Sequence, residues 1–98
     1  MKVTFLKEEC EVSVMRYPNG NTGIQLFVAA TGEPMATATT NLGKKLPKDQ
    51  AYIKDYSENA GMLEVLKEAG IVKKVIALEP SGFVMIPLCE LDLSVLEG

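Results

Sequence analysis

Hydrophobic and polar residues alternate along the first half of the chain. Between residues 10 and 17, and again between 23 and 29, apolar side chains are separated by polar ones with a period of two. This alternation is typical of strands that are buried on one face. Asn19 and Gly20 lie between the two segments, and this pair favours a tight hairpin because both residues tolerate positive φ. The pattern therefore predicts an antiparallel hairpin.

A helical pattern replaces the alternation in the second half of the chain. Apolar residues recur there at three- and four-residue spacing, which indicates one amphipathic helix. We expect Ser57 or Asn59 to be its N-cap and Gly70 to end it. Gly61 in the first turn should weaken the helix relative to alanine. The residues of the apolar stripe are Met62, Leu63, Leu66 and Ala69.

Short apolar runs predict the remaining strands. Residues 3–6, 35–40 and 51–54 extend the sheet before the helix. After the helix, residues 71–78 are interrupted by two lysines, so they form either two short pieces or an edge strand. An edge strand would be an obvious docking surface, because its outer N–H and C=O groups have no neighbour.

The end of the chain completes the expected fold. Residues 83–88 are apolar and are expected near the centre of the core, although Pro87 has no N–H to donate to a sheet. Residues 90–98 predict a final helical turn or, in the alternative, a frayed tail from about residue 91. The patterns predict an α+β fold, an antiparallel β-meander of about five to six strands packed against one α-helix. We expect residues 1–98 to form a single domain.

Composition limits the class of protein. The chain has 98 residues, of which 47% are hydrophobic, and a net charge of −3. This suits one globular core and argues against a general affinity for nucleic acid. No apolar run approaches the roughly eighteen residues of a membrane span. The first ten residues turn acidic at Glu8 and Glu9 and lack a signal-peptide core. We expect a cytoplasmic protein with no membrane partner.

The two cysteines, Cys10 and Cys89, lie far apart in the sequence. A secreted disulfide scaffold of this size usually carries about four or more. We expect two buried thiols that pack as small apolar groups. A bridge between neighbouring strands is the alternative, although a reducing cytoplasm would not preserve it.

The chain contains no histidine. This removes the commonest general base, the Ser-His and Cys-His nucleophile systems and the commonest zinc ligand. Carboxylates gather in three places, but none has the spacing of a calcium loop or accompanies a phosphate-binding glycine loop. We expect a protein that is not an enzyme and has no cofactor and no metal site; a carboxylate enzyme that uses a metal is the alternative. The carboxylates are Glu8, Glu9, Glu11, Asp55, Glu58, Glu90 and Asp92.

Two lysine clusters raise the question of an anionic partner. Lys44, Lys45 and Lys48 fall on one polar segment, and Lys73 and Lys74 fall on another. No aromatic residue is interleaved with them in the stacking pattern of single-strand binding. Solvated loops explain both clusters, and an anionic ligand such as a nucleotide is the alternative.

The segment from residue 52 to residue 59 is the candidate binding site. It places two of the three tyrosines beside charged residues where a strand leads into the helix. Tyrosine is an amphipathic anchor at binding surfaces, and a helix N-terminus offers free N–H groups to anions. In the alternative, Tyr56 packs beneath the helix and the polar residues only cap it. The candidate residues are Tyr52, Lys54, Asp55, Tyr56, Glu58 and Asn59.

Several strings in the chain resemble a family of small uncharacterised proteins with a domain of unknown function, encoded by phages, plasmids and conjugative elements of gut bacteria. The strings are YPNGNTGIQL (17–26), ATGEP (30–34), YIKDYSENAGML (52–63) and PSGF (80–83), and Cys89 also fits. The resemblance covers nearly the whole chain, to about residue 91. It implies an origin in a mobile element of a bacterial host, and it transfers no functional residues.

That origin and the missing catalytic groups together suggest a function. Small proteins of mobile elements without enzyme equipment are often inhibitors of host defence. We expect a non-enzymatic protein that binds a bacterial anti-phage defence complex, in the manner of an anti-CRISPR protein. One alternative is a sponge that sequesters a nucleotide immune signal with Tyr52, Lys54 and Tyr56 across a homodimer interface. Another is a structural or accessory subunit of a mobile-element assembly, which would expose an apolar patch.

Overall fold

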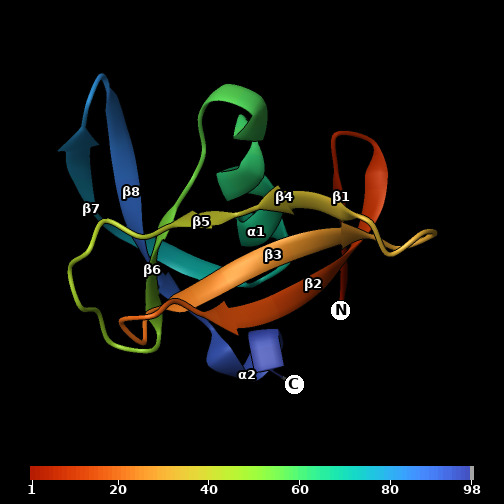
Figure 1. Cartoon of the computed structure of the whole chain (residues 1–98), viewed down its shortest axis with the longest axis horizontal. Coiled ribbons are helices and arrows are strands. Elements are labelled where there is room, and N and C mark those ends of the chain that lie inside the picture. The colour runs from red at the N-terminus through yellow and green to blue at the C-terminus, as the bar shows by residue number, and fades with distance from the viewer. Residues whose placement is uncertain (98) are drawn as a thin grey trace.

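Two antiparallel sheets and two short α-helices make up residues 1–97, which the computed structural model describes (Figure 1). The expected α+β class is confirmed, with one more short helix and more strands than expected. The first sheet has the order β1 (Lys2–Phe5), β2 (Glu8–Arg16), β3 (Thr22–Val28), β4 (Pro34–Thr37). The second has the order β5 (Thr39–Thr40), β6 (Gln50–Ile53), β8 (Val84–Leu91), β7 (Val72–Ser81). The helices are α1 (Met62–Glu68) and α2 (Leu93–Glu97), and a 3-10 turn, η1, spans Ser57–Asn59.

The two sheets join at Ala38, which lies between β4 and β5. Its N–H donates to the carbonyl of Ile24 on β3 (2.8 Å), and its carbonyl accepts from the N–H of Lys54, directly after β6 (2.8 Å). Ala38 is buried, so these groups are satisfied by the two sheets and not by water. The chain therefore passes from one sheet to the other at a single residue.

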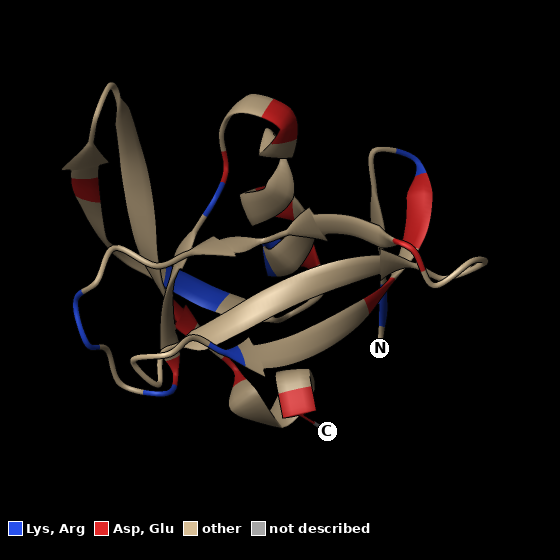
Figure 2. Ribbon diagram, viewed as in Figure 1, with Lys and Arg blue, Asp and Glu red and all other residues tan. Residues whose placement is uncertain are grey.

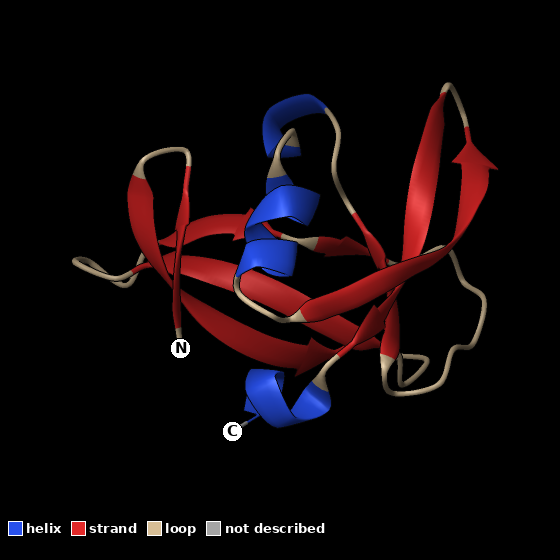
Figure 3. Cartoon of the chain, turned by 180° about the vertical axis from the view of Figure 1, so that it is seen from behind, coloured by secondary structure: helices blue, strands red, loops and turns tan. Residues whose placement is uncertain are grey.

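Helix α1 packs against β1 of the first sheet and β7 of the second, as the view from behind in Figure 3 shows. Met62 and Leu66, from the predicted apolar stripe, are fully buried. They share one core cluster with Leu26 of the first sheet and Cys89 of the second. Cys10 and Cys89 are buried free thiols, as expected. Burial raises the pKa of both thiols, that of Cys89 to about 11.

The approach to α1 differs from the expectation. Helix α1 begins only at Met62, after the separate turn η1, so the predicted N-cap at Ser57 or Asn59 is wrong. Gly61 stands directly before α1 with a φ of 97°, a left-handed conformation that strains any residue with a Cβ atom. The expected cost of Gly61 is therefore also wrong, because glycine is what lets the chain turn into the helix.

Strands β7 and β8 form a long hairpin that extends beyond the rest of the second sheet (Figure 1, Figure 3). β7 is one continuous edge strand with two irregularities in register, which confirms the edge-strand alternative. β8 lies between β6 and β7, but β6 pairs with it only from Leu88 to Glu90. The outer part of the hairpin has no third strand beside it. The expectation that residues 83–88 lie in the core is therefore wrong for Phe83 and Met85, which are exposed.

The last described residues form α2, the first of the two alternatives for this segment. Asp92 precedes the helix, and its carboxylate accepts from the Ser94 hydroxyl (2.5 Å) and from the N–H of Val95 (3.2 Å). These bonds lower the pKa of Asp92. Gly98, which the frayed-tail alternative included, lies outside the described residues. Across residues 1–97, the structure contains no helix with the length and hydrophobicity that crossing a membrane requires.

Candidate functional site

The side chain of Tyr52, a predicted anchor for a partner, is only 1% exposed. Its hydroxyl donates to the carboxylate of Glu79 on β7. Since β8 lies between β6 and β7, the side chain of Tyr52 crosses β8. Its backbone is opposite Leu88, and Ile86, two residues further along the same side of β8, is buried. Tyr52 therefore ties the hairpin to β6, and its ring is not accessible to a partner.

Asp55 and Asn59 also hold the fold together. Asp55 Oδ1 accepts from the N–H groups of Gly61 (3.1 Å) and Leu63 (2.9 Å), which are free donors at the start of α1. Asn59 is buried, and its Nδ2 donates to the carbonyl of Thr37 at the end of β4 (2.7 Å). These two side chains fix the path of the chain between β6 and α1.

Lys54, Tyr56 and Glu58 form the accessible part of the predicted site. The ammonium of Lys54 pairs with the carboxylate of Glu58 at 2.8 Å and lies 5.8 Å from the centre of the Tyr56 ring. The hydrogen bond between the two charges raises the pKa of Lys54 and lowers that of Glu58. The charges of Lys54 and Glu58 are thus directed at each other. Binding at the six predicted residues stays a prediction.

The side chain of Asn21 forms hydrogen bonds to the lysine-bearing segment between β5 and β6. This side chain is buried, although it is polar. Its Nδ2 donates to the carbonyl of Lys44 (2.8 Å) and to Oδ1 of Asn41 (3.2 Å), and its Oδ1 accepts from the N–H of Leu46 (2.9 Å). The segment was expected to be irregular and solvated, and its backbone is nevertheless fixed by the turn between β2 and β3.

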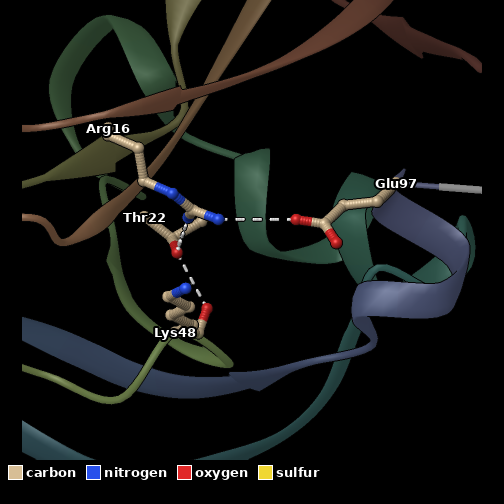
Figure 4. Close-up of polar contacts among 4 residues, drawn as sticks. All are labelled: Arg16, Thr22, Lys48 and Glu97. Carbon is tan, nitrogen blue, oxygen red and sulfur yellow. Dashed lines mark hydrogen bonds and ion pairs between the residues drawn. The ribbon is translucent and has the colours of Figure 1, made fainter.

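A second set of polar contacts anchors the end of the same segment (Figure 4). The Thr22 hydroxyl donates to the carbonyl of Lys48 (2.8 Å) and accepts from the guanidinium of Arg16. Arg16 also pairs with Glu97 of α2 at 3.5 Å. Arg16 therefore links β2 to the last helix, and through Thr22 it is connected to the end of the lysine segment.

The carboxylate clusters do not converge on a common centre. Glu9 pairs with Lys2 at 3.5 Å, and Glu11 pairs with the amino group of Met1 at 3.6 Å. Within residues 1–97, no three His, Cys, Asp or Glu side chains gather closely enough to hold a metal ion. A hollow of about 300 Å³ between β1, β2 and α1 is lined by Lys2, Glu9, Glu68 and small or β-branched residues, and it contains no arrangement of a nucleophile and a base.

The hairpin β7–β8 exposes an apolar surface that the sequence did not predict, although residues 71–78 were predicted as a possible docking edge. Its outer part exposes large apolar side chains: Val75, Ile76, Leu78, Phe83 and Met85. Leu78 is 57% exposed and Met85 is 54% exposed, and Phe83 at the turn is fully exposed. Leu6 and Leu42 are the other strongly exposed large hydrophobic residues in the described part of the chain after Met1, and each is isolated on its own turn.

The hairpin is also almost free of charge. Between Val75 and Cys89 the sequence contains one charged residue, Glu79. Figure 2 shows this single acidic position on β7, with basic positions only at the base of the hairpin. Monomeric proteins rarely expose a large contiguous apolar surface, and where one occurs it is often functional.

Sequence reasoning missed this surface because an apolar strand residue looks the same whether it is buried or exposed. One signal was available: Glu79 is the single charged residue between Val75 and Cys89. Comparison of the chain with protein-family models, with curated proteins and with solved structures finds no match, and the resemblance to a mobile-element family stays a prediction.

Proposed function

We propose that this chain is a non-enzymatic binding protein that docks onto a protein partner through the hairpin β7–β8. The observation that carries the proposal is the set of exposed apolar side chains on the outer part of the hairpin, where residues 75–89 contain one charge. Their exposed fractions together correspond to about three fully exposed side chains, on the order of 500 Å². A patch of this size is near the upper end for a monomer and is often functional.

The hairpin docks through its side chains and not by adding a strand to its edge. The outer edge of β7 is interrupted by two irregularities in register. It also carries Lys73 and Lys74, which are exposed, and Pro80, which has no N–H to donate. Bulges, lysines and proline are the features that protect edge strands from pairing with another chain. Backbone hydrogen bonds along the edge of β7 are therefore not available to a partner, and the exposed apolar side chains of the hairpin provide the binding energy.

The partner that we propose is a component of a bacterial anti-phage defence complex, and the chain inhibits it by occupying a functional surface. The resemblance to mobile-element proteins and the missing histidine support this choice. A structural or accessory subunit of a mobile-element assembly is the second candidate, because such a subunit would expose the same apolar patch. A nucleotide sponge is less favoured, since Tyr52 is buried and Lys54 is paired with Glu58.

The test is capture of partners from bacteria that carry defence systems, with identification of each captured protein and a binding measurement on the purified pair. Leu78→Ser/Phe83→Ser should abolish binding. Leu6→Ser, which removes a side chain 62% exposed on the β1–β2 turn, is the matched control and should bind normally. Expression of the wild-type chain should raise phage infection in such hosts. The proposal fails if no defence component binds in a hairpin-dependent way and infection does not change.

A further inference from the structure

We propose that the first partner of the hairpin is a second copy of this chain, and that two hairpins pack face to face about a two-fold axis. The inference rests on the proposed function in one respect, namely that the hairpin is a docking element. It adds a second copy of the chain as the occupant of the hairpin before another protein replaces it, and it adds the face that is used. Three observations carry it: the direction of one row of side chains, the position of the single charge, and the area available.

The apolar face of the hairpin is a direct continuation of the inner face of the core. Side chains two apart on a regular strand point to the same side. On β8 the row that contains Leu91 and Cys89, both buried in the core, continues through Pro87 to Met85, which is 54% exposed. Leu78 is opposite Pro87 on β7 and lies on the same face. The row of side chains that faces the core therefore continues onto the outer part of the hairpin, where it becomes exposed at Met85.

The single charge between residues 75 and 89 is on the opposite face. Glu79 is opposite Ile86, which alternates with Met85 and Pro87 along β8. On that face the carboxylate of Glu79 accepts the hydrogen bond from Tyr52. The face with Leu78 and Met85 thus carries no charge at all.

An uncharged apolar face is complementary to another copy of itself. The chain as a whole carries a net charge of −3, so two copies repel each other over much of their surfaces. The hairpin face is where they meet without bringing like charges together. A surface that resembles a core cut in half is also characteristic of homodimer interfaces, which are more apolar than transient ones.

The area suits a weak dimer. Val75, Leu78 and Met85 on this face, with Phe83 at the turn, correspond to roughly 2.6 fully exposed side chains, or roughly 400 Å² per copy. The pair then buries roughly 800 Å², an area typical of a weak association. The outer part of the hairpin is held in place before any contact forms, because the Tyr52 side chain crosses β8 and bonds to Glu79 on β7. A surface that is already ordered loses less conformational entropy when it binds.

The first experiment is sedimentation of the full chain over a concentration series from roughly 1 μM to roughly 1 mM, the range in which a small interface is expected to form. We expect the mass to rise from that of one chain, 10.6 kDa, toward twice that value. Leu78→Ser/Met85→Ser should remain monomeric throughout. Leu6→Ser should dimerise like the wild type. Circular dichroism of each variant establishes that it is folded.

A second experiment does not depend on weakening the fold. Met85→Cys introduces an exposed thiol at the predicted two-fold contact, whereas Cys10 and Cys89 are buried. With diamide as the oxidant, this variant should form a covalent dimer in high yield. Leu6→Cys, at a similar exposure, should not.

The outcomes separate this inference from the proposed function. A wild-type chain that stays monomeric and does not cross-link through Met85→Cys overturns the inference, while a hairpin-dependent complex with another protein would leave the proposed function standing. A dimer that persists in Leu78→Ser/Met85→Ser also overturns it, because the contact must then lie elsewhere. Hairpin-dependent binding to vesicles of phosphatidylglycerol and phosphatidylcholine by a monomer would overturn both.

Discussion

Asp55 provides the sharpest test of how this chain is held together, because the same residue was a candidate for binding and is found capping a helix. Helix α1 has seven residues, and its N-cap residue, Gly61, has no side chain to bond to the free N–H groups. Asp55 supplies that bond from six residues upstream, with Oδ1 at 3.1 Å from the N of Gly61 and 2.9 Å from the N of Leu63. Asp55→Ala removes both contacts.

The expected loss follows from these two bonds. Removing a capping side chain costs about 0.5–2 kcal/mol, and a negative charge near a helix N-terminus adds about 0.3–1 kcal/mol at a surface position. Two acceptor contacts put Asp55→Ala in the upper half of this range, at about 1–2 kcal/mol. In a domain of this size, each kcal/mol lowers the melting temperature by about 4–8 °C. We therefore expect a decrease of about 4–16 °C.

The assay is urea unfolding followed by far-UV circular dichroism, with Asp55→Asn as the control. Asparagine keeps an oxygen acceptor at the same position and loses only the charge, so it should recover more than half of the lost free energy of unfolding. An Asp55→Ala protein as stable as the wild type would refute the capping role. If asparagine were as damaging as alanine, the charge and not the acceptor would be what matters.

Three further substitutions or conditions test other contacts. Asn21→Ala should lower the free energy of unfolding by about 2–3 kcal/mol, because it leaves the N–H of Leu46 and the carbonyl of Lys44 without partners. Trypsin should also cleave the lysine-bearing segment between β5 and β6 faster in this variant. Gly61→Ala should cost about 1 kcal/mol in urea unfolding despite the higher helix propensity of alanine, because φ is 97°. Stability should also fall as the pH rises from about 8.5 toward 11: the folded pKa of Cys89 is about 11, so only the unfolded thiol ionises in this window. The loss approaches about 2–3 kcal/mol at the upper end, and Cys89→Ala should remove this part of the pH dependence.

Local patterns predicted those parts of the fold that depend on neighbours in sequence. The hairpin around Asn19 and Gly20 formed as expected, with Gly20 at a φ of 90° and its N–H bonded to the carbonyl of Tyr17. The apolar stripe on α1 was also predicted correctly, since Met62 and Leu66 are fully buried. The predicted start of α1 was wrong, because the side chain that caps the helix belongs to Asp55, which lies outside it.

The candidate site could be predicted only in part, for a different reason. Whether a strand residue is buried depends on what covers it, and that is a tertiary property. β6 ends at Ile53 and pairs with β8 no further than Leu88. The apolar residues of β8 between Leu88 and the turn therefore have no strand of β6 beside them. The sequence of β8 contains no sign of where β6 stops. The exposure of Met85 and Phe83 therefore could not be derived from their own pattern.

The predicted segment and the observed surface are connected through one residue. Tyr52 was chosen because tyrosine is common at binding surfaces, and its ring is buried against β8. Its hydroxyl nevertheless bonds to Glu79, the single charge of the hairpin between residues 75 and 89. The strand register puts that carboxylate on the rear face, apart from Leu78 and Met85 on the front face, and the bond fixes its position there. Under the proposed function, Tyr52 therefore supports the docking surface from the interior and does not touch the partner.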